Sequence, residues 1–183
     1  MTSKFTNRVI ALGTFDGLHP GHRAVIETCV RFAKEIEASS LVYTFWENPK
    51  VFFGGVSRNL MSAAQKLTEI LKLGADEVVA DHFDRALSML SPEDFVSMLV
   101  TRFQAIAFVC GQDYTFGAGG KGDSQTLAAL AASHRIQTIV VPTVKVLTHD
   151  GYDGEKVSST LIRKALDSGD IDTAEKLLRG DAI

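Results

Sequence analysis

The sequence alternates short apolar runs with longer segments in which apolar residues recur every three or four positions. The apolar runs have the length of strands and lie at residues 8–12, 41–45, 77–80, 105–110 and 138–141. The segments with helical spacing lie at residues 22–36, 62–74, 91–103, 124–133, 158–166 and 173–178. This alternation is typical of parallel strands joined by crossover helices. The sequence therefore predicts an α/β fold with a doubly wound parallel sheet of about five strands.

The composition favours one domain. The chain has 183 residues, of which 45% are hydrophobic, and this is enough for one well-buried core but short for two. We therefore expect a single domain over residues 1–183. The formal net charge is −3 and no run of lysine or arginine stands out, so nucleic acid is not an expected partner.

The cysteines and the apolar segments bear on the cellular compartment. Cys29 and Cys110 lie in apolar segments without a CxxC partner, which favours buried thiols in a reducing compartment. No apolar stretch approaches the length of a transmembrane helix, and the apolar segment near the N-terminus is too short for a secretory signal. We therefore expect a cytoplasmic protein that does not act at a membrane. The sequence leaves the oligomeric state open.

The stretch GTFDGLHPGH, which ends at His22, connects the first predicted strand to the first predicted helix. Ligands of a doubly wound sheet bind beyond the carboxyl ends of its strands. Gly13 and Gly17 let the backbone approach a ligand, and Gly21 precedes a helix start whose free amides favour an anion. Because His19 and His22 can both donate hydrogen bonds toward that point, the stretch predicts a phosphate site.

Two other interpretations of these histidines stay open. A zinc site needs a third and usually a fourth ligand, and the remaining histidines, His82, His134 and His149, are scattered without the spacing of ligands. A histidine near a helix start can also be purely structural. The surrounding glycines and the position between a strand and a helix favour the phosphate site.

A second glycine-rich stretch, GAGGKG at residues 117–122, formally matches the dinucleotide pattern G-x-G-x-x-G. Residues 111–116 separate it from the preceding strand, and no acidic residue closes the next strand at Val141. It is not a P-loop either, since Thr115 occupies the first position of that pattern and Gly122 follows the lysine. We interpret this stretch as a mobile loop over a ligand.

A third cluster is VSSTLIRKAL, in which hydroxyl groups stand at a predicted helix start. Ser158, Ser159 and Thr160 provide these hydroxyls, and Arg163 lies one helical turn further along. A helix N-terminus with an arginine that can fork around oxygen atoms suits an anion. An ordinary capped helix is the alternative. Two helix starts that favour anions in one α/β domain are harder to explain as coincidence.

The motifs together resemble the FMN adenylyltransferase (FAD synthetase) module of bacterial riboflavin kinase/FAD synthetase proteins, in the HxGH nucleotidyltransferase superfamily. The matching segments, in chain order, are GTFDGLHPGH at 13–22, TFWENP at 44–49, FD at 83–84, SPEDF at 91–95, GQDYTFG at 111–117, KGD at 121–123 and SSTLIR at 158–163. The resemblance covers essentially the whole chain. It implies a Rossmann-like fold of the nucleotidyltransferase type.

The resemblance implies transfer of AMP from ATP to FMN, which gives FAD and pyrophosphate. His19, His22 and Arg163 would be the catalytic residues. The implied ATP-binding residues are Gly13, Thr14, Phe15, Asp16, Gly17, His19, Gly21, His22, Ser158, Ser159, Thr160 and Arg163. Magnesium would accompany ATP through its phosphate oxygens, without a protein metal site.

The resemblance also implies a flavin pocket, and here the chain departs from the family pattern. The implied FMN-binding residues are Asn48, Pro49, Phe53, Asp113, Tyr114 and Phe116. Glu47 and Asn48 precede Pro49 where the family has a further proline and a histidine. Thr115 stands where the family tends to carry an arginine, and Lys121 or Arg58 is a candidate to replace its charge.

Family members commonly continue into a riboflavin kinase barrel, whereas this sequence stops near that border, so we expect no kinase domain in these residues. Two alternatives stay open for the function. One is nucleotidyl transfer to another phosphorylated acceptor. The other is a flavin- or nucleotide-binding module without catalytic activity.

Overall fold

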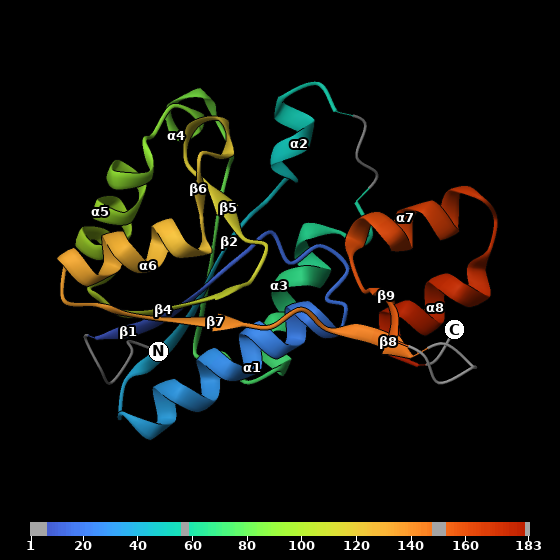
Figure 1. Ribbon diagram of the computed structural model, residues 1–183, viewed down its shortest axis with the longest axis horizontal. Helices are drawn as coiled ribbons and strands as arrows, with labels where there is room; N and C mark the ends of the chain where they lie inside the picture. The colour runs from blue at the N-terminus through green and yellow to red at the C-terminus, as the bar shows by residue number, and fades with distance from the viewer. Residues whose placement is uncertain (1–6, 56–58, 148–152, 182–183) are drawn as a thin grey trace.

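A five-stranded parallel sheet forms the centre of the computed structural model, which describes residues 7–55, 59–147 and 153–181 (Figure 1). In spatial order the strands are β3 (Glu77–Asp81), β2 (Ser39–Phe45), β1 (Arg8–Leu12), β4 (Ala105–Gly111) and β7 (Gln137–Val141). Every neighbouring pair in this sheet is parallel. The chain moves outward from β1 to β3 and then resumes at β4 on the other side of β1. The predicted doubly wound α/β sheet is confirmed.

The central strand β1 is buried on both faces of the sheet. Val9 and Ala11 belong to the core on one face, and Ile10 and Leu12 belong to the core on the other. None of these four side chains is more than 1% exposed. A strand covered on both sides reads as a continuous apolar run, which is why RVIAL predicts it correctly.

Helices cover both faces of the sheet (Figure 1). Helices α1 (Pro20–Glu35) and α3 (Ala63–Lys72) bury their apolar stripes against the core that contains Val9. Helices α5 (Pro92–Phe103) and α6 (Ser124–Ser133) pack on the opposite core. The sheet with these helices places the β1–α1 loop at the carboxyl edge, where parallel α/β proteins bind ligands.

The C-terminal helices form a pair with a small core of its own. Helix α7 (Ser159–Asp167) packs on α8 (Ile171–Arg179), and α8 also contacts α1. The residues buried between them are Val157, Ile162, Ala165, Ala174 and Leu177. An antiparallel ribbon of β8 (Lys145–Leu147) and β9 (Asp153–Lys156) leads the chain into α7. This pair lies beside the sheet and brings the start of α7 to the β1–α1 loop (Figure 1).

Some elements differ from the sequence prediction. Helix α1 begins at Pro20 rather than at His22, because proline fits the first turn, where no intrahelical amide bond is lost. The last helix begins at Ile171 rather than at 173, after the cap residue Asp170. The elements that the sequence did not predict are α2 (Pro49–Phe52), α4 (Arg85–Ser88), β5 (Thr115–Phe116), η1 (Ala118–Gly120), β6 (Gly122–Asp123), β8 and β9.

The glycine-rich stretch at 117–122 forms part of an ordered ribbon. Strands β5 and β6 pair antiparallel, and the 3-10 turn η1 lies between them. The Gly122 position has no room for a side chain, since a Cβ there would lie 2.7 Å from the Phe116 ring. Motion of this segment over a ligand stays a prediction.

Candidate active site

The loop between β1 and α1 has an unusual backbone. The φ angle is positive at Phe15 (49°), Gly17 (85°) and Leu18 (44°). Non-glycine residues rarely adopt such angles, and each costs on the order of 1 kcal/mol. Phe15 and Leu18 are only 1% and 3% exposed, so their burial in the core holds this conformation. At Gly17 the φ angle of 85° would strain a residue with a side chain, and a Cβ would also lie 2.7 Å from Leu60 Cδ1.

Two histidines of this loop stack on each other at the start of α1. The ring centroids of His19 and His22 are 3.7 Å apart, with 23° between the ring planes. Phe15 meets His22 edge to face at 5.5 Å. Gly21 leaves the space that the His19 ring fills, because a Cβ there would lie 3.3 Å from that ring. The β1–α1 loop therefore fixes both imidazoles in one place.

Burial keeps both imidazoles neutral. It lowers the pKa of His19 from 6.5 to about 4, with further contributions from the positive charges of Lys156 and Arg23. It also holds the pKa of His22 well below its usual value, together with His19, Lys66 and Arg163. Among the described residues, neither Nδ1 atom has a hydrogen-bond partner although both are buried. Unsatisfied buried nitrogens of this kind suit hydrogen bonds with a ligand.

The start of α1 offers a second feature for an anion. His19 occupies the N-cap position, but its side chain makes no capping hydrogen bond. The first turn of α1 contains no acidic side chain. The positive end of the helix dipole is therefore not neutralised by the helix itself, and it favours a phosphate.

Asp16 joins the β1–α1 loop to α7. Its carboxylate pairs with the guanidinium of Arg163 and accepts a hydrogen bond from the amide of Leu60 at 2.9 Å. The hydroxyl of Ser159 donates to the carbonyl of Asp16 at 2.8 Å. The Asp16 and Arg163 side chains are 7% and 16% exposed. Ser158 caps the same helix by accepting a hydrogen bond from the Leu161 amide at 3.2 Å. Two helix starts thus meet at one place.

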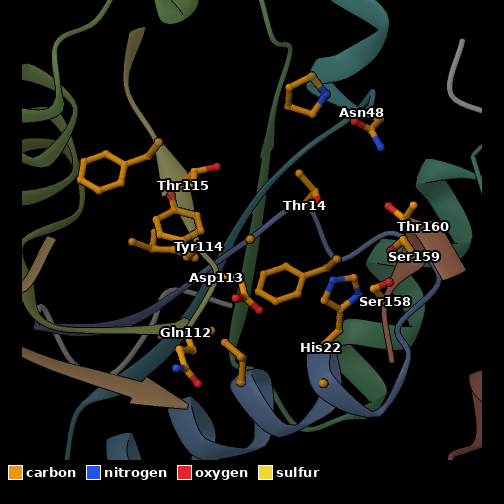
Figure 2. Close-up of a pocket in the computed structure, with 18 of the residues that line it drawn as sticks. Thr14, His22, Asn48, Gln112, Asp113, Tyr114, Thr115, Ser158, Ser159 and Thr160 are labelled. Carbon is orange, nitrogen blue, oxygen red and sulfur yellow. The ribbon is translucent and has the colours of Figure 1, made fainter. Parts of the chain in front are cut away.

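A cavity of about 510 Å³ opens at this place, within the size range of pockets for small molecules (Figure 2). Sixteen of the eighteen residues assigned to ATP and FMN from the sequence line it: Gly13, Thr14, Phe15, His19, Gly21, His22, Asn48, Pro49, Phe53, Asp113, Tyr114, Phe116, Ser158, Ser159, Thr160 and Arg163. Figure 2 shows Thr14, His22 and residues 158–160 on one side, and Tyr114 and Thr115 on the other.

Comparison with known proteins identifies the family. The FAD synthetase family matches residues 1–161 of the chain. The chain belongs to this family. A bifunctional riboflavin kinase/FMN adenylyltransferase of Listeria monocytogenes is 33% identical over 175 residues, which cover 94% of this chain and 54% of the relative. A putative protein of the same description from Geobacillus thermodenitrificans is 31% identical, over 93% of this chain and 88% of the relative.

One solved structure shares the fold over nearly the whole chain. It is a protein of Streptococcus pneumoniae described as a macrolide-efflux protein, with a TM-score of 0.81 and 27% sequence identity. The match covers 97% of this chain and 56% of the solved chain. The chain therefore spans about half the length of this structure and of the Listeria relative. The likeness shows that the two proteins share this α/β fold.

Two residues predicted for ATP in this FAD synthetase family member do not line the large cavity. Asp16 is 5% exposed, and its carboxylate is used by Arg163 and Leu60. Gly17 lies in the buried turn next to Leu60. Both residues support the β1–α1 loop through buried contacts on the side away from the large cavity. The sequence pattern alone does not distinguish a residue that supports this loop from one that lines the cavity.

Of the residues predicted for the flavin, Tyr114 lies across the cavity from residues 158–160, whereas Asn48 lies on their side (Figure 2). Tyr114 and Phe116 stack with 5.6 Å between their ring centroids. Phe53 is 65% exposed and meets Phe83 at 5.8 Å. Asn48 caps α2, since its side chain accepts a hydrogen bond from the Lys50 amide at 3.1 Å. The cavity therefore offers aromatic faces to a flat ring system.

Charged residues that the sequence analysis missed also line the cavity. Lys50 lies on α2, and Lys156 ends β9, where it pairs with Asp113. Lys156 stands two residues before Ser158, in a polar segment without periodicity, so only its position ahead of a helix start could have indicated it.

Lys121, the proposed substitute for the arginine absent at Thr115, is exposed and does not line the cavity. Arg58 and His149 lie outside the described residues.

In residues 7–55, 59–147 and 153–181, no group of three or more histidine, cysteine, aspartate or glutamate side chains could hold a metal ion. In the same ranges, no helix is both long and apolar enough to cross a membrane.

Proposed function

We propose that this member of the FAD synthetase family is an FMN adenylyltransferase, which transfers AMP from ATP to FMN and releases pyrophosphate. The observation that carries the proposal is the neutral, stacked pair of His19 and His22 on a cavity that also receives the start of α7. The names of the relatives from Listeria and Geobacillus support the same reaction.

In this proposal the triphosphate lies between the two helix starts. Gly13, Thr14 and Phe15 line the cavity beside the histidines, and Ser158 and Thr160 line it from α7. His19 and His22 donate hydrogen bonds to the α-phosphate and to the leaving pyrophosphate, where negative charge increases in the transition state. Because the imidazoles are neutral before ATP binds, they cost no unpaired buried charge in the free protein.

Arg163 contributes a fixed positive charge. It lines the cavity, while its guanidinium is held by the carboxylate of Asp16. An arginine that is positioned in advance loses less side-chain entropy when the outer phosphates arrive. We assign Arg163 to these phosphates, and we assign Asp16 to holding it.

The nucleophile is the phosphate of FMN. One of its oxygens attacks the α-phosphorus of ATP, a new P–O–P bond forms, and the bond from the α-phosphorus to the bridging oxygen of pyrophosphate breaks. The FMN phosphate is already ionised at neutral pH, so the reaction needs no general base. Positioning and electrostatic stabilisation supply the catalysis.

Magnesium would come with ATP. Among the described residues that line the cavity, Asp113 supplies the one carboxylate, and it is paired with Lys156. This set suits a metal ion bound chiefly by phosphate oxygens, which neutralises part of their charge. The described residues thus provide no dedicated protein cage for it.

The flavin ring would lie against the aromatic side of the cavity. Phe53, Tyr114 and Phe116 offer ring faces, and Asn48, Pro49 and Asp113 line the same cavity. We also infer a reducing, cytoplasmic location, since Cys29 and Cys110 are free thiols that are fully buried.

The test is pyrophosphate release from ATP and Mg²⁺ with a panel of acceptors, with flavin products separated by chromatography. The panel contains FMN, riboflavin and several other phosphorylated acceptors. The proposal predicts FAD with FMN and no product with riboflavin, which lacks the attacking phosphate. If pyrophosphate were released only with another phosphorylated acceptor, that acceptor and not FMN would be the substrate. Binding of FMN without any release would indicate a binding module.

A further inference from the structure

Lys66 is a buried lysine outside the cavity. It lies on α3, and the residue is only 6% exposed. Its ammonium group donates hydrogen bonds to the carbonyl oxygens of Thr14, at 3.2 Å, and Phe45. Phe45 ends β2, and Thr14 follows the end of the neighbouring strand β1. Lys66 therefore connects the carboxyl ends of two central strands.

The carbonyl of Thr14 is held from two directions. The hydroxyl of Thr44 donates to it at 3.0 Å, in addition to the ammonium of Lys66. Thr14 itself lines both the large cavity and the small hollow that contains Lys66 and Asp16. The β1–α1 loop that carries the stacked histidines is thus anchored one residue before its first residue with a positive φ angle, Phe15.

Burial of an ammonium group is costly unless it is hydrogen-bonded, and an apolar residue of similar volume is often as stable. Burial lowers the pKa of Lys66, whereas the carboxylates of Asp16 and Glu47 oppose this effect. A lysine at this position therefore needs a reason other than packing. Its hydrogen bond to the Thr14 carbonyl, in the loop that carries the histidine pair, supplies that reason.

We propose that Lys66 is a positioning residue for AMP transfer, which fixes the β1–α1 loop through Thr14 and places a positive charge behind the histidine pair. This inference rests on the proposed function. Lys66 acts through the backbone and the electrostatic field, since it does not line the cavity that receives the substrates.

The electrostatic part follows from the charges around His22. The groups that lower the pKa of His22, after burial, are His19, Lys66 and Arg163. A cation that disfavours protonated His22 also favours a phosphate anion at the same place, because both effects come from one positive potential. Lys66 therefore helps to keep His22 neutral and to attract the triphosphate.

The test compares Lys66→Met with Lys72→Met, a matched control on the same helix. The Lys72 side chain is 65% exposed and pairs with Glu69 on the surface. In Lys66→Met we expect kcat/KM for ATP to fall about 100-fold, as for a small displacement of reacting groups. Lys66→Arg should recover part of this loss, and KM for FMN should change little. Equal kcat/KM for ATP in Lys66→Met and Lys72→Met would overturn the inference.

A second readout does not depend on turnover. An NMR titration of the histidines should show a higher pKa for His22 in Lys66→Met and no change in Lys72→Met. A His22 pKa that is unchanged in both variants would contradict the electrostatic part. The proposed function fails instead if the wild-type protein forms no FAD, so the two failures are distinguishable.

A third variant serves if Lys66→Met does not fold. Thr44→Val removes the other hydrogen bond to the Thr14 carbonyl without removing a charge. We expect it to lower kcat/KM for ATP about 10-fold, the effect of one lost hydrogen bond of ordinary strength. An unchanged kcat/KM in a folded Thr44→Val protein would contradict the role of this anchor.

Discussion

The imidazole rings of His19 and His22 stack 3.7 Å apart at the start of α1. Two positive charges at this distance would repel strongly, so the pair can carry at most one positive charge at moderate pH. Both rings are neutral in the free protein because burial lowers both pKa values. They are therefore ready to interact with a phosphate group without first losing a proton.

The first prediction concerns His22→Ala. If His22 donates a hydrogen bond to the charge that develops on the α-phosphate, kcat should fall about 100- to 1,000-fold. The Nδ1 atom of His22 has no hydrogen-bond partner to lose among the described residues, so the loss of stability should be limited to the packing of its ring on His19 and Phe15. The measurement is steady-state kinetics together with a melting curve.

The control for this variant is His134→Ala. His134 is exposed at the end of α6 and does not line the cavity. It should keep the wild-type kcat. A lower melting temperature for His22→Ala with unchanged kcat would instead show that His22 has a packing role.

The second prediction is a pH dependence of stability. The pKa of His19 is about 4 in the folded protein and 6.5 when unperturbed, so the unfolded chain binds a proton that the folded protein rejects. This effect leaves the free energy of unfolding at its full value above pH 6.5 and lowers it as the pH falls toward about 4. Between about pH 7.5 and about pH 5 the free energy of unfolding falls by about 2 kcal/mol.

Denaturant unfolding at several pH values checks this prediction. His19→Asn should flatten the fall of the unfolding free energy below about pH 6.5, since asparagine does not titrate. An identical slope in the variant and the wild type would show that His19 is protonated normally in the folded protein.

The third prediction separates capping from substrate binding. Ser158 caps α7 and Ser91 caps α5, and each accepts a hydrogen bond from an amide of its helix. Each alanine variant should lose about 1 kcal/mol of stability. Only Ser158→Ala should raise KM for ATP, by about 10-fold, because only Ser158 lines the cavity. Equal KM values for ATP in both variants would remove Ser158 from the phosphate site.

The fourth prediction concerns the flavin side. Phe53 is 65% exposed, so Phe53→Ala should cost little stability. If its ring covers the flavin, KM for FMN should rise about 10-fold while KM for ATP stays unchanged. Ile171→Ala is the matched control, since Ile171 is 53% exposed on α8 and does not line the cavity. A KM for FMN that matches the control would place the flavin elsewhere.

The sequence predicts the sheet and most helices because their signals are local. Strand β4 reads as an apolar run, and the pairing of Ser62 with Gln65 forms the predicted capping box of α3. The two-residue strands β5 and β6 are too short to show a periodicity. The sequence also indicates the β1–α1 loop and the start of α7, because glycines and hydroxyls are typical of helix starts that favour anions.

The contacts that hold the site could not be read from the sequence. Asp16 and Arg163 are 147 positions apart, so only the fold shows their pairing. Phe15 and Leu18 adopt positive φ angles although neither is a glycine, and burial rather than propensity decides this. Lys66 is buried on a helix where a lysine normally indicates the exposed face. Each of these features depends on tertiary packing.

The most direct test of the account follows the AMP group itself. The protein is incubated with FMN, Mg²⁺ and ATP labelled at the α-phosphate, and the flavins are separated by chromatography. If the protein transfers AMP to FMN, the label elutes with FAD, in an amount equal to the pyrophosphate released, and His22→Ala greatly slows its appearance. FMN that is bound by the folded protein but never acquires the label would contradict the account.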